Sequence, residues 1–308
     1  MSVSASPHGA ASAIDSRGLR LVPRTRTLIG DYIELTKPKV QSLLLLITVA
    51  TMYVAGDPSP VLVLLTCLGG SLSAGGAGAI NHYVDRDIDA QMTRTATRPV
   101  PAGRIRPRAA LAFGCALAAL SVVELWLAVN PLAAGLSFSG FLGYVFVYTL
   151  WLKRRTPQNI VIGGAAGAVP PLVGWAAVRG SVGGTAVILF FIVFFWTPPH
   201  FWALSLLMKN DYARVGIPML PVVRGEQETR RQILLYSVLL YAVTQLPFCA
   251  GGFGAIYLVA SLLLGIGFVA FAVALSRRAD RRSALRVYLY SLAYLALLFC
   301  AMVADAHL

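Results

Sequence analysis

An amide and two carboxylates recur every four residues in the segment NHYVDRDID, residues 81–89. A helix turns about 100° per residue, so Asn81, Asp85 and Asp89 share one face, drifting about 40° at each step. Asp87 points to the opposite side. Oxygen ligands at this spacing suit a hard divalent cation, and Mg²⁺ commonly binds one or two carboxylates together with substrate phosphates. The spacing therefore predicts a magnesium site on this face.

Arginines follow these acids closely. Arg94 and Arg98 lie one helical turn apart, and Arg104 comes soon after them. The guanidinium group is suited to bidentate recognition of phosphate. Metal-binding acids followed by arginines, directly after an apolar segment, indicate a pyrophosphate site. The alternative is a charged loop in which the acids and arginines pair with one another.

A second polar segment, KNDYARVGIPMLP at residues 209–221, again combines an acid with bases. Lys209, Asp211 and Tyr212 open it, directly after another apolar segment. By itself this pattern is weak. If the fold brought both segments over one cavity, they would form a single site.

Three further residues are candidates for contacting a substrate. His200 lies in an otherwise apolar, aromatic stretch, where an ionisable residue predicts a function by default. It could contact a substrate, or simply bond to a carbonyl freed by the preceding prolines. His82 adjoins the first motif. Lys37 could reach a phosphate, or could extend its charged end toward water.

The composition is that of a membrane protein. Hydrophobic residues make up 57% of the 308 residues and charged residues only 13%, against about 25% in soluble domains. Soluble, disordered, fibrous and disulfide-scaffold classes are thereby excluded. The four cysteines lie in apolar runs without a C-x-x-C pair, which is typical of buried apolar residues. The net charge of +13 fits basic membrane loops better than nucleic-acid binding.

Nine apolar runs are long enough to cross a bilayer, which takes about 20 residues. Short, nearly uncharged turns such as Asn130-Pro131 alternate with long basic connections. We therefore predict an all-α, polytopic membrane bundle of nine transmembrane helices. The predicted spans are 40–56, 61–80, 109–129, 131–151, 159–178, 185–208, 233–250, 253–275 and 286–304.

These spans place 25 of the 26 basic residues on one side, with only Arg179 opposite. By the positive-inside rule, the N-terminus is cytoplasmic and the C-terminus lies across the membrane. Residues 1–30 are predicted to be a disordered cytoplasmic tail, with a mitochondrial transit peptide as the alternative. Residues 31–308 are predicted to form one transmembrane domain. A transporter would carry its acids near the midplane rather than at one edge, which argues against that class.

The first motif, in its long form NHYVDRDIDAQMTRTATRPVPAG (81–103), resembles the first signature of the UbiA-type intramembrane prenyltransferases. Within that family it is similar to the branch that farnesylates haem. The segments TPPHFWAL (197–204), KNDYARVGIPMLPVV (209–223) and DYIELTKPKV (31–40) resemble the same branch. Many relatives carry Asp-x3-Asp in the second motif, whereas Leu207 stands four residues before Asp211 here. Because of this departure, it stays open whether the second motif holds a second Mg²⁺.

The resemblance implies a bundle around a central cavity, in which Mg²⁺ on the acidic motif binds an isoprenyl diphosphate. It implies transfer of a farnesyl group from farnesyl diphosphate to a vinyl group of haem B, with addition of water. An aromatic or quinone-precursor polyprenyltransferase is the alternative. The aromatic side chain that would stabilise the allylic cation stays open among several candidates, which are Tyr83, Tyr148, Trp196 and Trp202.

The resemblance also implies roles for particular residues and a place in the cell. Asn81, Asp85, Asp89, Lys209 and Asp211 would carry the catalytic motifs. The expected substrate contacts are Arg94, Arg98, Arg104, Lys37, Tyr83, His82, His200 and Tyr212. The expected partners are the lipid bilayer and a haem A synthase, without nucleic acid. The membrane would be the bacterial plasma membrane, with the mitochondrial inner membrane as the alternative.

Overall fold

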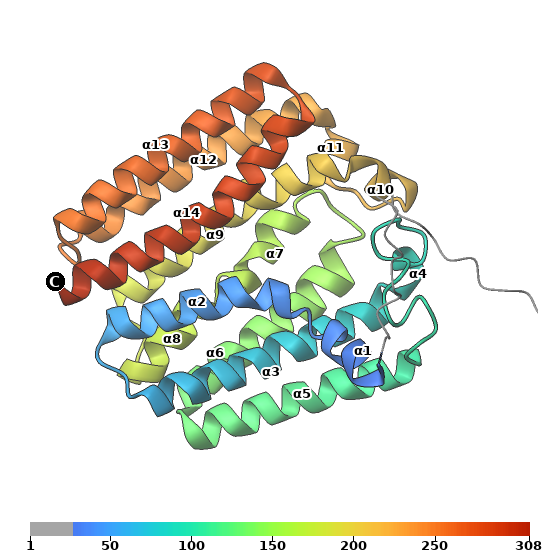
Figure 1. The fold of residues 1–308 in the computed structure, drawn as a ribbon, viewed down its shortest axis with the longest axis horizontal. Coiled ribbons are helices and arrows are strands. Elements are labelled where there is room, and N and C mark those ends of the chain that lie inside the picture. Colours follow the sequence, from blue (N-terminus) through green and yellow to red (C-terminus); the bar gives the residue numbers. More distant parts are fainter. Residues whose placement is uncertain (1–26) are drawn as a thin grey trace, which may run out of the picture.

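The computed structural model describes residues 27–308, and this part of the chain forms helices and no strands (Figure 1). Nine of its helical segments are long and apolar enough to span a membrane. The predictions of an all-α protein and of nine spans are therefore confirmed. The predicted tail over residues 1–30 falls almost entirely outside the described range.

Most spans are single helices, and two are composite. The single helices are α2 (Pro38–Ala55), α3 (Pro60–Val84), α5 (Pro107–Ala128), α9 (Gly184–Leu207), α12 (Gly225–Cys249), α13 (Ala255–Arg278) and α14 (Arg281–His307). The composite spans are α6 (Pro131–Leu142) with the π-helix η1 (Gly143–Leu152), and α7 (Asn159–Gly167) with α8 (Pro170–Arg179). The connections contain the short helices α1 (Leu28–Leu35), α4 (Arg86–Asp89), α10 (Lys209–Arg214) and α11 (Leu220–Val223).

Prolines and polar caps define where many helices begin. Proline stands in the first turn of α2, α3, α5, α6 and α8, where its missing N–H costs no helical hydrogen bond. The Ser59 side chain accepts from the backbone N–H of Leu62 and caps α3. Asn130 caps α6 and also donates to the carbonyl of Ala176 at 2.9 Å, which ties α6 to α8.

The spans close into one bundle. α3 packs along α5, α13 packs between α12 and α14, and α14 returns to pack against α2. α9 contacts α7, α12 and α14. The short helices α1, α4, α10 and α11 gather at one end of the bundle, on the right in Figure 1, and the C-terminus lies at the other end. The polar motifs of the sequence are therefore brought to a common end.

Glycine allows α3 and α5 to cross at close range. A Cβ atom built on Gly76 would lie 2.7 Å from the carbonyl oxygen of Gly114, which is backbone and cannot turn aside. A Cβ atom on Gly114 would in turn lie 2.9 Å from the carbonyl oxygen of Gly76. The small residues of the second span thus serve helix packing at this crossing.

The two Pro-Pro pairs have different effects. Pro170-Pro171 follows a break between α7 and α8, so the fifth span is made of two helices. Pro198-Pro199 lies inside α9, which runs on to Leu207. Helix α12 begins at Gly225, eight positions before the predicted start at 233, because a polar first turn precedes its apolar run.

Candidate functional site

The first motif lies at the end of α3, where its amide and acids are buried. Asn81 in the last turn is 4% exposed, and Asp85, which caps the helix, is fully buried. Asn81 Nδ2 donates to Asp85 Oδ2 at 2.7 Å, as expected for neighbours four residues apart. The helix breaks at Asp85, yet the backbone N–H of Asp89 still donates to the Asp85 carbonyl at 2.8 Å. The predicted face therefore survives this break.

Basic side chains from three other segments surround the motif. They neutralise the buried acids, which would otherwise be costly to remove from water. The contacts are Lys37 Nζ to Asn81 Oδ1 at 2.6 Å, Arg98 Nη1 to Asp89 Oδ2 at 2.6 Å, an ion pair of Lys153 with Asp85 Oδ2, and Arg154 Nη2 at 3.6 Å from Asp85 Oδ1.

Lys153 is a site residue that the sequence analysis missed. It directly follows η1, and its N–H bonds to the Tyr148 carbonyl five residues earlier. In the same helix, the Thr149 hydroxyl donates to the Tyr144 carbonyl and lies 3.4 Å from Asn81 Nδ2. Helices with this wider turn are rare and often occur at functional sites. The available signal was a lysine directly after the fourth span, on the membrane side that carries the acids.

Lys37 is held in an unusual conformation. Its φ of 55° lies in the left-handed region, which non-glycine residues seldom adopt and which is enriched at functional sites. Burial, aided by the positive charges of Arg98 and Lys153, lowers the pKa of its ammonium group to about 7. The predicted phosphate contact thus lies directly beside Asn81.

Asp87 lies outside the buried cluster. Arg154 binds its two carboxylate oxygens, each at 2.7 Å, and this pairing lowers the pKa of Asp87 to about 2. The side chain is 57% exposed. Its position agrees with the prediction that Asp87 points away from the other two acids.

The second polar segment meets the first. Arg214 Nη1 in α10 donates to the Thr93 hydroxyl at 3.1 Å, across the gap between the two connections. A pocket of about 330 Å³ opens where they meet, and its lining includes Thr93, Arg94, Leu207, Asn210, Asp211 and Arg281. Of the predicted residues, Arg94 and Asp211 therefore face the same space.

Two residues of the second segment point elsewhere. Lys209 Nζ pairs with Glu226 Oε1 at 2.9 Å, at the start of α12. Tyr212 is half-buried and packs against the main apolar core. The structure thus brings Asp211, but neither of these two, to the wall of the pocket.

Three other residues that were predicted to contact the substrate lie near the first motif. Arg104 Nε binds Asp31 Oδ1 at 2.9 Å, and its Nη2 lies 3.6 Å from Glu34, so this arginine anchors α1. The guanidinium carbon of Arg86, Cζ, lies over the Tyr83 ring, 4.6 Å from the ring centre. His82 is buried, and its Nδ1 has no hydrogen-bond partner among the described residues.

His200 lies in an aromatic layer between α9 and α14. Its ring stacks on Trp196 and Tyr288, with centroids 4.3 and 4.9 Å away. His200 Nδ1 bonds to the Ser291 hydroxyl at 2.7 Å. The hydrogen bond of this ring nitrogen therefore goes to a neighbouring helix rather than to a carbonyl freed by the prolines. The other ring nitrogen, Nε2, has no partner in the described part of the chain.

The donor set at the first motif fits a magnesium ion. Asp85 Oδ1 is buried and accepts no hydrogen bond from any described residue. Within residues 27–308, no three His, Cys, Asp or Glu side chains lie close enough to hold a metal by themselves. Asp85 and Asp89 supply only oxygen ligands, and Mg²⁺ completes such a partial set with waters and substrate phosphates.

The described chain is thus a polytopic membrane bundle with a buried acid–base cluster at one end. Residues 43–299 match the UbiA prenyltransferase family, and the chain belongs to that family. The family expectation from the first motif is confirmed.

Individual relatives share more than the family pattern. A protein from Marinobacter nauticus named protoheme IX farnesyltransferase is 52% identical over 277 residues, covering 89% of this chain and 92% of the relative. One of the same name from Chloroflexus aurantiacus is 55% identical over 295 residues, covering 95% of this chain and 50% of the relative. This chain spans about half the length of the first curated relatives that it matches.

Solved structures show the same fold. A digeranylgeranylglyceryl phosphate synthase superposes with a TM-score of 0.74 at 21% identity, over 90% of this chain and 98% of the other. A UbiA homologue from Archaeoglobus fulgidus bound to GPP and Mg²⁺ gives a TM-score of 0.64 at 16% identity, over 88% and 99%.

Proposed function

We propose that this chain transfers the farnesyl group of farnesyl diphosphate to a vinyl group of haem B, with addition of water. The observation that carries the proposal is the buried Asp85 carboxylate, with one unbonded oxygen inside a ring of basic side chains. A ring of this kind suits a diphosphate head at the end of an apolar bundle. The haem acceptor is inferred from the relatives named protoheme IX farnesyltransferase.

The basic ring would assist departure of the diphosphate. Negative charge develops on the leaving oxygens as the C–O bond breaks, and fixed positive groups such as Arg98 and Lys153 stabilise it. Mg²⁺, held by Asn81, Asp85 and Asp89, would add positive charge to the same oxygens. Arg94, at the pocket shared with Asp211, would contact the outer phosphate.

The allylic carbon then needs dry and electron-rich surroundings. The rings of Tyr144 and Tyr148 lie 5.5 Å apart on η1, the helix that ends beside Asp85. Aromatic faces attract a neighbouring cation, so these rings are suited to this role. A haem vinyl group attacks the allylic carbon. Water then adds to the porphyrin-side cation and loses a proton, which leaves a hydroxyethylfarnesyl substituent.

The haem would approach from the opposite wall of the bundle. We place His200 Nε2, the ring nitrogen that Ser291 does not bind, toward the haem as an iron or propionate contact. The farnesyl tail would lie in the cavity expected between the spans. A haem A synthase would consume the product, and the enzyme would reside in the bacterial plasma membrane with its basic end facing the cytoplasm.

The test is product analysis with matched carboxylate variants. Membranes carrying the chain are incubated with haem B, farnesyl diphosphate and Mg²⁺, and the haems are separated and weighed by mass spectrometry. We expect haem heavier by one farnesyl group and one hydroxyl group. Asp85→Asn and chelation of Mg²⁺ should abolish the product, whereas Asp87→Asn, which changes an exposed acid of the same motif, should retain it.

Two outcomes would overturn the assignment. Folded protein that makes no modified haem, but prenylates an aromatic acceptor, would point to a quinone-precursor enzyme. Equal losses in Asp85→Asn and Asp87→Asn would show that the buried carboxylate has no special part in the reaction. A parallel titration of haem B into His200→Ala protein tests the haem contact, since a lost iron ligand shifts the Soret band.

A further inference from the structure

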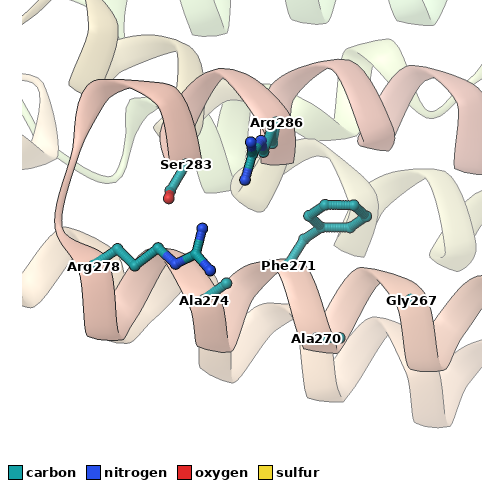
Figure 2. A pocket seen from close by; sticks show the side chains of 7 residues that line it. All are labelled: Gly267, Ala270, Phe271, Ala274, Arg278, Ser283 and Arg286. Carbon is teal, nitrogen blue, oxygen red and sulfur yellow. The ribbon is translucent and has the colours of Figure 1, made fainter.

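A second pocket lies between α13 and α14 (Figure 2). The connection between these two helices lies at the same end of the bundle as α10 and α11 (Figure 1). Its volume is about 260 Å³, and it shares no lining residue with the pocket at Arg94 and Asp211. One end is basic and the other is apolar. This arrangement is not used by the proposed reaction.

Two arginines form the basic end. Arg278 lies in the last turn of α13 and Arg286 in the second turn of α14, and both guanidinium groups point into the gap between these helices (Figure 2). Neither makes an ion pair or hydrogen bond with a described residue. Both feel the negative charge of Asp280, but a single carboxylate leaves this pair with a net positive charge, which favours an anion between them.

The neighbouring polar groups hold one another at the start of α14 and form no ion pair with either arginine. Asp280, the acid of this connection, accepts from the backbone N–H of Ser283 at 2.6 Å as the cap of α14. This bond keeps the pKa of Asp280 below its usual range, and the carboxylate stays at the helix end. Ser283 is 3% exposed and lines the gap (Figure 2), and its side chain also hydrogen-bonds to the Asp280 carboxylate.

The apolar end continues along α13 into the membrane. Gly267, Ala270 and Ala274 recur at three- and four-residue intervals, so they form one stripe of small side chains beside Phe271. From Arg278 to Gly267 the helix rises by about 16 Å. This length is close to half of the hydrocarbon thickness of a bilayer, about 30 Å, and so to one leaflet.

We propose that this pocket between α13 and α14 binds an anionic phospholipid from the leaflet on the basic side of the membrane. Its phosphate lies between Arg278 and Arg286. One acyl chain follows the small-residue stripe. Basic pockets between transmembrane helices are suited to acidic lipid headgroups, and the charge and the one-leaflet length together match a lipid better than a soluble anion.

The test measures lipid binding rather than activity. The full chain is purified in mild detergent, phosphatidylglycerol or phosphatidylcholine is added, and bound lipid is counted by native mass spectrometry. We expect Arg278→Gln with Arg286→Gln to weaken phosphatidylglycerol binding roughly tenfold or more. The matched control is Arg277→Gln with Arg282→Gln, which removes equal charge from neighbouring residues that do not line the pocket.

Further variants separate a lipid from a free anion. Ala274→Leu keeps both arginines and fills the stripe, so it should also weaken lipid binding, while Arg278→Lys with Arg286→Lys should retain part of it. Inorganic phosphate should not displace the lipid. Equal losses in the Arg277/Arg282 control, unchanged binding in Ala274→Leu, or displacement by phosphate would each overturn the proposal. Melting curves confirm that every compared variant is folded.

Discussion

Asp85 carries the most enclosed charge of the candidate site. It has no exposed surface, and basic groups approach both of its carboxylate oxygens, Lys153 on one side and Arg154 on the other. Lys153 lies 68 residues further along the chain. The contact therefore depends on the place of η1 beside α3. A buried carboxylate in this position needs its partner, because an unpaired charge in the interior is strongly destabilising.

Replacing Lys153 tests this dependence. In Lys153→Gln we expect the rate of farnesyl transfer to fall about 100-fold, since a fixed positive charge near the leaving diphosphate is lost. Lys153→Arg should recover part of the rate. The measurement is the initial rate of haem prenylation with radiolabelled farnesyl diphosphate, at matched amounts of folded protein.

Arg155→Gln is the control for this variant. Arg155 is exposed in the same connection, and it makes no ion pair with a described residue. Equal rates in Lys153→Gln and Arg155→Gln would contradict the assigned role of Lys153.

At the scale of helices, the crossing of α3 and α5 depends on the absence of side chains. Gly76 and Gly114 face each other's backbone, which cannot move as a flexible side chain could. The Ser121 hydroxyl donates to the Gly69 carbonyl at 2.7 Å further along the same pair of helices. This crossing fixes the helix whose last turn carries Asn81.

A methyl group at the crossing should therefore destabilise the protein. In Gly76→Ala we expect a loss of about 1–3 kcal/mol of stability, as for other overpacked sites, and a lower melting temperature. In Gly70→Ala the new Cβ would lie 3.9 Å from its nearest neighbour, so the melting temperature should hardly change. Heating followed by size-exclusion chromatography measures the melting temperature of both variants. Equal melting temperatures would contradict the requirement for glycine at this crossing of α3 and α5.

At the scale of the whole molecule, the odd number of spans in the described part of the chain predicts that Thr27 and Leu308 lie on opposite sides of the membrane. The basic connections all lie at the end that holds α1, α4, α10 and α11 (Figure 1). The positive-inside rule predicts that this end faces the cytoplasm. The candidate site would then draw its soluble substrates from the cytoplasmic side.

Cysteine labelling tests this orientation. In a background without Cys67, Cys115, Cys249 and Cys300, a maleimide that cannot cross membranes is added to intact bacteria. Leu308→Cys should be labelled, and Arg155→Cys should be labelled only after the cells are opened. Labelling of both in intact cells would contradict the predicted topology, and labelling of both after lysis is the control for accessibility.

Local patterns made much of this protein predictable. Apolar runs of membrane length and the one-sided distribution of basic residues were enough for the count of nine spans, because bilayer thickness and loop charge act on each segment separately. The contact of Asn81 with Asp85 followed from their spacing, since four residues make about one helical turn. Asp87 on the outer side followed from the same periodicity.

Contacts between distant segments depended on packing alone. Lys153 pairs with Asp85, whereas Arg104, which stands much nearer to the motif in the chain, pairs with Asp31. One Pro-Pro pair follows a break in a span and the other lies within α9, although the two dipeptides are identical. Such outcomes depend on which helices lie side by side. Periodicity within one helix carries no information about its neighbours, so only the assembled bundle decides them.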